Sequence, residues 1–358
     1  MKAAVVPQSK DSGKLAELKD IPIPSIDEDQ ILIKTKAFAV NPTDWKHIVY
    51  GFSKPGDVIG SDVSGVVEKV GSKVTNFQKG DIVSSFITGN VSPDSGAFAE
   101  YSVAYPGGTV KYDHSLDNAP KPEASTIDSY AGAASITLGL VTVAYSYSHS
   151  LKIASHIKPN DSILIWGGAT ATGVLAIQIA KLVYNLNVIT TASPKNHEYL
   201  KSLGADQVLD YNDPEVVNKL KSLGPIKFGL DTVSSPETFQ KVYDATEGTP
   251  EVYLDNLLSL SGESIKTDPK REGTVSFGTT LAYLAVIKEK QMGEVTIYQT
   301  PELLADYTKW WNEHVPAIIN KLKHTKLKLL NGGLSSADEA LKLSRDSKVS
   351  GEKVVFTV

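Results

Sequence analysis

Short apolar runs, each only a few residues long, dominate the first third of the chain. The clearest lie at 2–6, 31–40 and 58–70, and each is bounded by Pro, Gly or Asp. Alternating or continuous apolar runs between such turn residues are typical of β-strands. A further strand is expected at 96–103, and no helical period separates these runs. The pattern therefore predicts a small β-rich barrel or half-barrel over roughly the first 125 residues.

The pattern changes at about Ser125, where helical runs begin to alternate with short apolar strands. Strands are expected at 163–166, 187–192, 207–209, 228–233 and 252–258. Such alternation favours a parallel sheet with helices on both faces. Ligands of open α/β sheets lie at the carboxyl ends of the strands, so we count Val233, at the end of one strand, among the residues expected at the cofactor.

The last sixty residues are predicted to contain two helices and a strand. Apolar and aromatic residues recur at near-helical spacing over 302–323, which we interpret as a helix that packs on the first domain. A capped helix is expected to begin at Ser335 or Ser336, and 351–358 reads as a closing strand.

The most informative stretch is 163–181, where an apolar strand passes through a turn of small residues into an uninterrupted helical run. A strand, a glycine turn and a helix form half of a βαβ unit, whose helix N-terminus holds a pyrophosphate by its N–H groups and its dipole. Against the pattern Gly-x-Gly-x-x-Gly, the middle glycine is replaced by threonine. Small residues in such a turn can also serve close packing alone. The residues expected at the cofactor are Gly168, Ala169, Thr170, Ala171, Thr172 and Gly173.

The strand that follows this helix ends where an NAD site would place an acidic residue on the ribose. Residues 192–195 read Ala-Ser-Pro-Lys and contain no carboxylate. A carboxylate would repel a 2′-phosphate, whereas the hydroxyl of Ser193 and the ammonium of Lys195 would bind it. We therefore predict NADPH as the cofactor. The alternative for Lys195 is a solvated lysine at the start of a helix over 196–203.

Composition limits the classes of function. At 358 residues the chain exceeds the ~250–300 at which one core stops growing, so two domains are expected. A net charge of −5, without a cluster of Lys and Arg, argues against nucleic acid or an acidic membrane as a partner. The absence of cysteine excludes disulfides, thiol catalysis and every zinc site that contains cysteine.

Targeting and membrane segments are not expected. The apolar run at 1–7 is too short for a signal peptide and is not an Arg-rich presequence. The longest uncharged run, 129–151, is long enough to span a bilayer but is rich in Ser, Thr, Gly and Tyr, so we interpret it as a buried helix with its loop. A cytoplasmic location is the simplest expectation.

Ordered motifs along the whole chain resemble the medium-chain dehydrogenase/reductase superfamily. They are Asn-Pro-Thr-Asp-Trp-Lys at 41–46, Gly-Ser-Asp-Val-Ser-Gly at 60–65, Gly-Asp-Ile-Val at 80–83, Gly-Ala-Phe-Ala-Glu-Tyr at 96–101, the glycine turn, and Ser-Gly-Glu-Lys-Val-Val at 350–355. Within the superfamily the chain looks like the zinc-independent quinone oxidoreductase-like branch. It is most similar there to fungal aldehyde reductases and trans-acting enoyl reductases.

This resemblance implies an α/β fold with two domains and an active site in the cleft. A GroES-like β-rich substrate domain would comprise 1–127 and 300–358, and a Rossmann doubly wound parallel-sheet domain, which binds NADP, would comprise 128–299. The resemblance also implies a homodimer that pairs through an edge strand near 273–279.

The chain departs from the zinc-dependent members at the metal site. Zinc alcohol dehydrogenases carry Gly-His-Glu where this chain has Gly60, Ser61 and Asp62, and they use a cysteine that is absent here. Ser61 is a poor ligand, and Asp62 alone cannot hold a tetrahedral N/S site. We therefore expect no metal, and catalysis by placement of the nicotinamide against the acceptor with hydrogen-bond donors to the developing oxyanion.

The resemblance supplies the catalytic candidates Asn41, Lys46, His47, Tyr50 and Thr142. Asn41 matches a residue that faces the nicotinamide ribose and the substrate, although an Asn before Pro also simply begins a turn. Lys46, His47 and Tyr50 are alternatives for the proton donor, and His47 is included because histidine titrates near neutrality. An exposed loop lysine is the alternative for Lys46.

Two more cofactor contacts follow from the same resemblance. Tyr211 matches a tyrosine that helps to hold the 2′-phosphate, and Lys353 matches a residue near the cofactor, with a surface strand lysine as its alternative. The function expected is NADPH-dependent hydride transfer to an aldehyde, an α,β-unsaturated carbonyl or a quinone. The alternatives are a metal-free carbonyl reductase or alcohol dehydrogenase acting on C=O only, and a non-catalytic NADPH-sensing or RNA-binding protein on the same fold.

Overall fold

The structure, a computed structural model, describes residues 1–9 and 13–358. These residues divide into two compact units. The first contains Met1–Val141, Val286–Tyr298 and Lys323–Val358, and the second contains Thr142–Ala285 and Gln299–Leu322.

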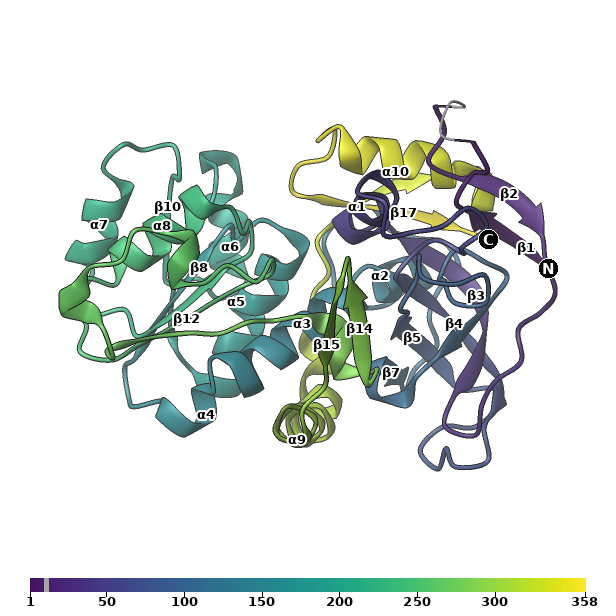
Figure 1. The fold of residues 1–358 in the computed structure, drawn as a ribbon, viewed down its shortest axis with the longest axis horizontal. Helices are drawn as coiled ribbons and strands as arrows, with labels where there is room; N and C mark the ends of the chain where they lie inside the picture. The colour runs from purple at the N-terminus through teal and green to yellow at the C-terminus, as the bar shows by residue number, and fades with distance from the viewer. Residues whose placement is uncertain (10–12) are drawn as a thin grey trace. The chain divides into compact units, whose positions relative to one another are not determined.

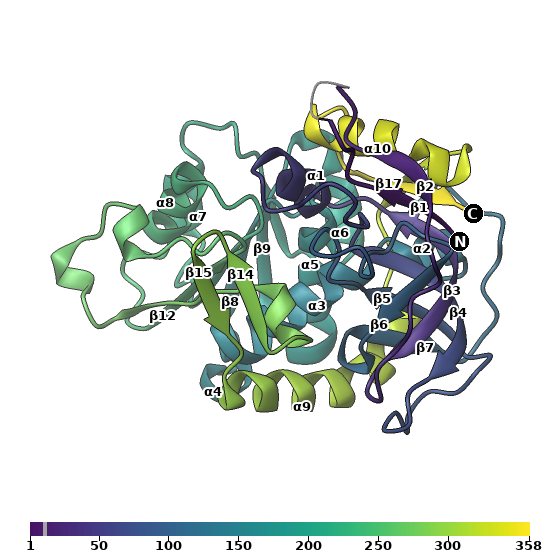
Figure 2. The same cartoon turned by 45° about the vertical axis from the view of Figure 1, so that its right-hand side comes forward.

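The first unit is built on a seven-stranded sheet, mostly antiparallel, in the order β16-β17-β3-β4-β5-β7 with β6 paired to β3. The two long strands β3 and β4 are buried along most of their length, and their apolar side chains contribute to the interior of this unit. Figure 2 marks β3, β4, β5 and β7 of this sheet. Its strands are β3 (Ile31–Ala39), β4 (Asp62–Val70), β5 (Ile82–Phe86), β6 (Tyr101–Ala104), β7 (Thr109–Tyr112), β16 (Lys326–Leu330) and β17 (Glu352–Thr357).

Two hairpins and three helices complete the first unit. The hairpins are β1 (Lys2–Val5) with β2 (Glu17–Asp20), and β14 (Glu289–Met292) with β15 (Val295–Tyr298). The helices are α1 (Pro42–Val49), α2 (Tyr130–Ala134) and α10 (Ala337–Arg345). The β-rich character predicted for the first part of the chain is confirmed.

The second unit has a six-stranded, wholly parallel sheet in the order β10-β9-β8-β11-β12-β13. Figure 1 labels β8, β10 and β12 of this sheet. The chain moves outward from β8 to β10 and then returns to the other side of β8. Because parallel crossovers are right-handed, the helices of the two halves cover opposite faces. The strands are β8 (Ser162–Trp166), β9 (Asn187–Thr191), β10 (Gln207–Leu209), β11 (Phe228–Asp231), β12 (Val252–Asn256) and β13 (Val275–Phe277).

The strand order of the second unit reverses between β8 and β11, the place where ligands bind in such sheets. The predicted doubly wound sheet is confirmed. Its helices are α4 (Ile153–His156), α5 (Ala171–Tyr184), α6 (His197–Ser202), α7 (Val216–Ser222), α8 (Pro236–Ala245) and α9 (Pro301–Ile318).

The uncharged run 129–151 becomes α2, α3 (Thr137–Tyr145) and a π-helical turn, η3 (Ser146–Ser150). Tyr147 in that turn is fully buried, as expected for a core segment. Within the described residues, no helix is both long and apolar enough to cross a bilayer.

The helix α9 corrects one expectation. The sequence placed it on the first domain, but its aromatic face packs within the second unit, where the indole N–H of Trp310 donates to the hydroxyl of Tyr184 on α5 at 2.7 Å. The hairpin β14–β15 lies in the first unit, although the expected boundary assigned it to the second domain. The unit boundaries therefore differ from 127/128 and 299/300, because contacts in space rather than order in the sequence define the units.

The start of α10 also differs in detail from the expectation. A 3₁₀ turn at Gly333–Ser336 precedes it, and Ser336 at the N-cap position makes no side-chain capping bond. Its hydroxyl instead accepts the N–H of Gly332 at 3.0 Å.

Candidate active site

The predicted cofactor residues other than Lys353 gather at the carboxyl edge of the parallel sheet in the second unit. The strand β8 ends at Trp166, and Gly167 turns the chain with φ +83°. Gly168 and Gly173 are buried, whereas the segment 169–172 at the start of α5 is partly exposed. The first turn of α5 is therefore open to a ligand, as expected of a pyrophosphate site.

The replaced middle glycine has a structural role. Thr170 is the N-cap of α5, and its Oγ1 accepts the N–H of Gly173 at 2.9 Å. The other two glycines are required sterically, since a Cβ on Gly173 would lie 2.4 Å from the carbonyl oxygen of Gly167 and one on Gly168 would lie 2.1 Å from Oγ1 of Thr190. Close packing and an accessible helix terminus therefore occur together in this turn.

The residues predicted at the 2′-phosphate follow two neighbouring strands. Ser193 and Lys195 come after β9, Tyr211 comes after β10, and the N–H of Ala192 donates to the carbonyl of Leu209 at 2.9 Å. Lys195 is exposed, and Tyr211 is 41% exposed. The structure thus brings these three predicted residues to one edge, beside the strand that carries the glycine turn.

Val233 lies against the same turn. It follows β11, is 49% exposed, and its Cγ2 would be 2.8 Å from a Cβ built on Gly167. The buried carboxylate of Asp231 holds this segment by accepting the N–H of Val233 at 2.9 Å and the hydroxyl of Thr238 at 2.6 Å. Burial raises the pKa of Asp231.

Thr232 links the ends of β8 and β11, the two strands between which the strand order reverses. It was not singled out from the sequence. Its Oγ1 donates to the carbonyl of Trp166 at 2.8 Å and accepts from Oγ1 of Thr170 at 2.9 Å. A threonine at a strand end carries no pattern that would have identified it.

The predicted catalytic residue Asn41 belongs to a buried polar cluster of the first unit, which we call the Asn41 cluster: Asn41, Asp44, Ser61, Asp62 and Lys353. Each of these side chains is 6% exposed or less. Asn41 Nδ2 donates to Oδ2 of Asp62 at 2.9 Å, and the ammonium of Lys353 donates to Asn41 Oδ1. The same ammonium lies 3.5 Å from Oδ2 of Asp62. Asn41 and Lys353 are therefore direct partners, although the sequence assigned them separate roles.

The two carboxylates of the cluster sit in different environments. Asp44 accepts hydrogen bonds from the hydroxyl of Ser61 at 2.7 Å and from the backbone N–H of Asn41 at 2.7 Å. Asp62 accepts one from the backbone N–H of Leu138 at 2.6 Å, in addition to the one from the Asn41 amide. Burial raises the pKa of Asp44 to about 7, against the opposing effect of its hydrogen bonds, and the charge of Asp62 adds to the increase. Burial also raises the pKa of Asp62.

The three alternatives for the proton donor on and after α1 differ in exposure. Tyr50 is 62% exposed, while Lys46 is half-buried with its ammonium 5.8 Å from the centroid of the Trp45 ring. Burial lowers the pKa of Lys46. His47 is buried, and burial together with the charge of Lys290 lowers its pKa to about 3. The expectation that His47 titrates near neutrality is thus corrected: its ring is neutral at pH 7.

Lys290 is a further candidate that the sequence did not indicate. It lies in β14, is 6% exposed, and burial lowers its pKa to about 8. Its neighbours in the sequence are a mixture of charged and polar residues typical of a surface hairpin, so no pattern marked it. Thr142, the remaining catalytic candidate, lies in α3 and is 8% exposed.

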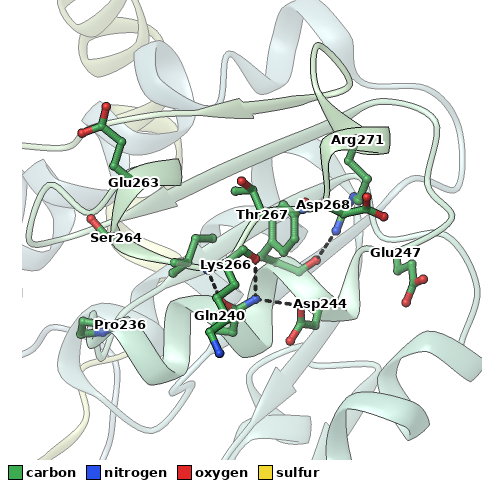
Figure 3. Close-up of a pocket in the computed structure, with 12 residues that line it drawn as sticks. Pro236, Gln240, Asp244, Glu247, Glu263, Ser264, Lys266, Thr267, Asp268 and Arg271 are labelled. Atoms are coloured by element: carbon green, nitrogen blue, oxygen red, sulfur yellow. Dashed lines mark hydrogen bonds between the residues drawn. The ribbon is translucent and has the colours of Figure 1, made fainter.

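A cavity of about 750 Å³ lies elsewhere in the second unit, along α8 and the segment 263–271. Most of the residues that line it are polar or charged by type, and Figure 3 shows Arg271, Asp268 and Glu247 to one side. Arg271 is already engaged, because its guanidinium donates to the carbonyl of Tyr243 at 2.8 Å and stacks on that ring. The cavity contains none of the predicted site residues.

Comparison with known proteins matches both parts of the chain. The family described as alcohol dehydrogenase GroES-like domain matches residues 27–113, and the family described as zinc-binding dehydrogenase matches residues 171–249. An uncharacterized protein of Saccharomyces cerevisiae is 33% identical over 99% of this chain and 97% of its own length. A trans-enoyl reductase of Alternaria alternata is 32% identical over 96% of this chain and 95% of its own length.

Solved structures share the fold. The quinone oxidoreductase from Coxiella burnetii has a TM-score of 0.69 and 25% identity over 100% of this chain and 99% of its own. A mycobacterial protein solved in complex with NADPH has a TM-score of 0.70 and 23% identity over the full length of both chains, 100% of each. Because relatives at least 32% identical span nearly the whole chain, it belongs to the medium-chain dehydrogenase/reductase superfamily, in the branch that contains quinone oxidoreductases and trans-enoyl reductases.

Proposed function

We propose that the chain is an NADPH-dependent, zinc-independent reductase of aldehydes, α,β-unsaturated carbonyls or quinones. The observation that carries the proposal is the common edge formed by the glycine turn, Ser193 with Lys195, and Tyr211. A helix N-terminus suits the pyrophosphate, and a hydroxyl, an ammonium and a phenol suit a 2′-phosphate.

Two features support NADPH over NADH. The segment 192–195 after β9 has no carboxylate to bind an unphosphorylated ribose. Lys195 is exposed, so its ammonium is accessible to a phosphate of the cofactor. The mycobacterial protein with the same fold binds NADPH, in agreement with this assignment.

The Asn41 cluster does not fit a catalytic zinc ion. The hydroxyl of Ser61 is engaged as a donor to Asp44, and the Asp62 carboxylate is surrounded by donors and lies 3.5 Å from the ammonium of Lys353. That ammonium would repel a second cation, and no cysteine exists to complete an N/S donor set. Hydrogen-bond donors must therefore stabilise the oxyanion.

In the proposed reaction, NADPH supplies a hydride when bound, and the residues of the chain orient the acceptor and provide the proton. For a simple carbonyl the hydride goes to the carbonyl carbon, and for a conjugated one it goes to the β-carbon. Trans-enoyl reductases occur among the relatives, and this supports a conjugated carbonyl as an acceptor beside a simple aldehyde.

The test is oxidation of NADPH and of NADH by an aldehyde, an enal and a quinone, with and without a metal chelator and with products identified by mass. Turnover that prefers NADPH and resists the chelator is expected. Loss of turnover with chelator would contradict the zinc-independent mechanism, and tight NADPH binding without turnover of any acceptor would favour a sensor.

The variant Lys195→Glu tests the cofactor site. Removal of a charged hydrogen bond worth ~1.5–3 kcal/mol should raise the NADPH dissociation constant by roughly tenfold or more, with little effect on NADH. Lys201→Glu is the matched control, because Lys201 is an exposed lysine on α6, away from the strand ends. An equal loss of NADH and NADPH affinity would show that Lys195 does not contact the 2′-phosphate.

A further inference from the structure

A histidine and two carboxylates meet within the second unit, outside the predicted cofactor and catalytic residues. His149 lies in the π-helical turn η3, and Glu302 and Asp306 lie one turn apart at the start of α9. One ligand atom of each side chain, a ring nitrogen or a carboxylate oxygen, lies within 4.8 Å of the other two. The closest pair is Nδ1 of His149 with Oδ2 of Asp306, at 2.8 Å. Three side chains that ligate metals therefore converge from two elements.

The π turn brings His149 to α9. The N–H of Leu151 donates to the carbonyl of Ser146, five residues earlier, at 2.8 Å. Such a turn contains one residue more than an α-helical turn, and π turns within helices are frequent at functional sites. Tyr147 of the same turn is fully buried, and its hydroxyl donates to the carbonyl of Ala176 on α5 at 3.0 Å. The turn is therefore anchored in the core while the imidazole reaches α9.

The two carboxylates are supported by the same neighbour. The helix α9 is fixed on α5 by the bond from the indole of Trp310 to the hydroxyl of Tyr184. Glu302 and Asp306 are four positions apart, so they share one face of α9. Because η3 and α9 both pack on α5, the three donor groups project from a rigid support, as a preformed metal site requires.

The charges at this place favour a divalent cation. Two carboxylates at positions i and i+4 of a helix repel each other. The ammonium of Lys152 lies 2.7 Å from Oε1 of Glu302, but the two side chains are 40% and 64% exposed. Exposed ion pairs of this kind are weak. A divalent ion can therefore replace the lysine as the partner of Glu302 and bond to both carboxylates at once.

The donor set matches an ion that accepts nitrogen as well as oxygen. Zn²⁺ bonds to imidazole nitrogen and carboxylate oxygen at about 2.0–2.2 Å, which places neighbouring ligand atoms of a tetrahedron roughly 3.3 Å apart. Side-chain rotation must close the larger separations, and Glu302, the most exposed of the three, has the freedom to do so. Mg²⁺ and Ca²⁺ prefer oxygen alone, so the imidazole of His149 favours Zn²⁺ over them.

We propose that His149, Glu302 and Asp306 bind a divalent transition-metal ion of the Zn²⁺ type, with water completing its coordination. The ion joins the π turn to the start of α9 and stabilises the second unit. The expectation of no metal was derived for the catalytic position alone, and the new site shares no residue with the Asn41 cluster or with the glycine turn. The proposal is therefore independent of the proposed reductase function.

The experiment is calorimetric titration of the whole chain, untagged and stripped of metal, with ZnCl₂, accompanied by thermal unfolding with and without Zn²⁺. The parent should bind one Zn²⁺ and unfold at a higher temperature in its presence, because an ion that binds only the folded state stabilises it. Mg²⁺ should bind much more weakly. Thermal unfolding without Zn²⁺ shows whether each variant is folded.

His149→Ala and Glu302→Gln should each weaken Zn²⁺ binding on the order of 10²-fold or more, since loss of a ligand costs at least as much as loss of a residue that orients one. Glu313→Gln is the matched control, because Glu313 is an exposed glutamate of α9 outside the site, and it should bind Zn²⁺ as the parent does. No Zn²⁺ binding by the parent at millimolar concentration would overturn the proposal. Equal affinities of the parent, His149→Ala and Glu302→Gln would do so as well.

Lys152→Met distinguishes a metal site from a cluster held by ion pairs alone. Removal of the competing ammonium should tighten Zn²⁺ binding several-fold, since the ion then meets Glu302 without its partner. The control is Lys309→Met, at an exposed lysine of α9, which should leave the affinity unchanged. Weaker Zn²⁺ binding by Lys152→Met than by Lys309→Met would contradict the proposed ligand set.

Discussion

Burial moves the ionisation of Asp44 into the physiological pH range. The side chain is completely buried, and its pKa rises from the usual 3.8 to about 7. A group with a raised pKa binds its proton more tightly in the folded state. The contribution of Asp44 to the free energy of unfolding is therefore greatest below pH 4. It falls as the pH rises from about 4 to 7, because ionisation of this carboxyl costs more in the folded than in the unfolded chain.

Asp44→Asn should therefore flatten the pH dependence of stability. Between pH 4 and 7 the contribution of Asp44 falls by up to ~1.4 kcal/mol per pH unit in the parent, and an amide has no such dependence. Urea unfolding at pH 5 and pH 8 measures the difference. Asp94→Asn, at an exposed position, is the control. Parallel pH profiles for the parent and Asp44→Asn would contradict the raised pKa.

At the scale of single residues, local motifs were easier to predict than their partners. The glycine turn could be located because a strand end, small residues and a helix start lie within a few positions. The contact of Lys353 with Asn41 joins positions 312 apart, and no local pattern reports it. The pKa of His47 also depends on burial and on Lys290, so the sequence could supply only the usual titration range of histidine.

At the scale of elements, the turn between β8 and α5 depends on the Thr170 side chain, which caps the helix, and on the close approach of the backbone at Gly173 to the carbonyl of Gly167. Thr170→Ala should destabilise the protein by about 1 kcal/mol, because the N-cap acceptor of Gly173 is lost. NADPH affinity should fall as well, since the first turn of the helix is where the pyrophosphate is expected. Thermal unfolding and fluorescence titration measure the two effects.

The controls for this turn are Thr170→Ser and Thr172→Ala. Serine keeps the capping oxygen and should restore most of the stability. Thr172 is partly exposed and is not the cap, so its truncation should have little effect on stability. A Thr170→Ser variant as unstable as Thr170→Ala would show that the methyl group, rather than the cap, supports the turn.

Strands could be predicted more accurately than the packing of helices. The strand segments of the second unit agree with their apolar runs to within a few residues, since a buried parallel strand is apolar on both faces. The position of α9 was wrong because an amphipathic helix reveals that it has an apolar face, but not which surface covers that face.

At the scale of the whole molecule, β13 is one of the two edge strands of the parallel sheet, opposite β10. Its contacts with β12 include the carbonyl of Thr274 and the N–H of Gly278. Because backbone direction alternates along a strand, the N–H of Val275 points away from β12, toward the open edge. Such an edge can pair with the same edge of a second copy.

We predict that the chain forms a dimer through this edge and that Val275→Pro disrupts it. Proline removes the outward N–H of Val275 but none of the bonds to β12, so the monomer should remain folded. Val275→Ala is the matched control, because it also shortens the partly buried side chain but keeps the N–H group. Light scattering after size-exclusion chromatography should show a dimer for the parent and the alanine variant, and a monomer for the proline variant. A monomeric parent, or a dimeric Val275→Pro, would place any self-association elsewhere on the surface.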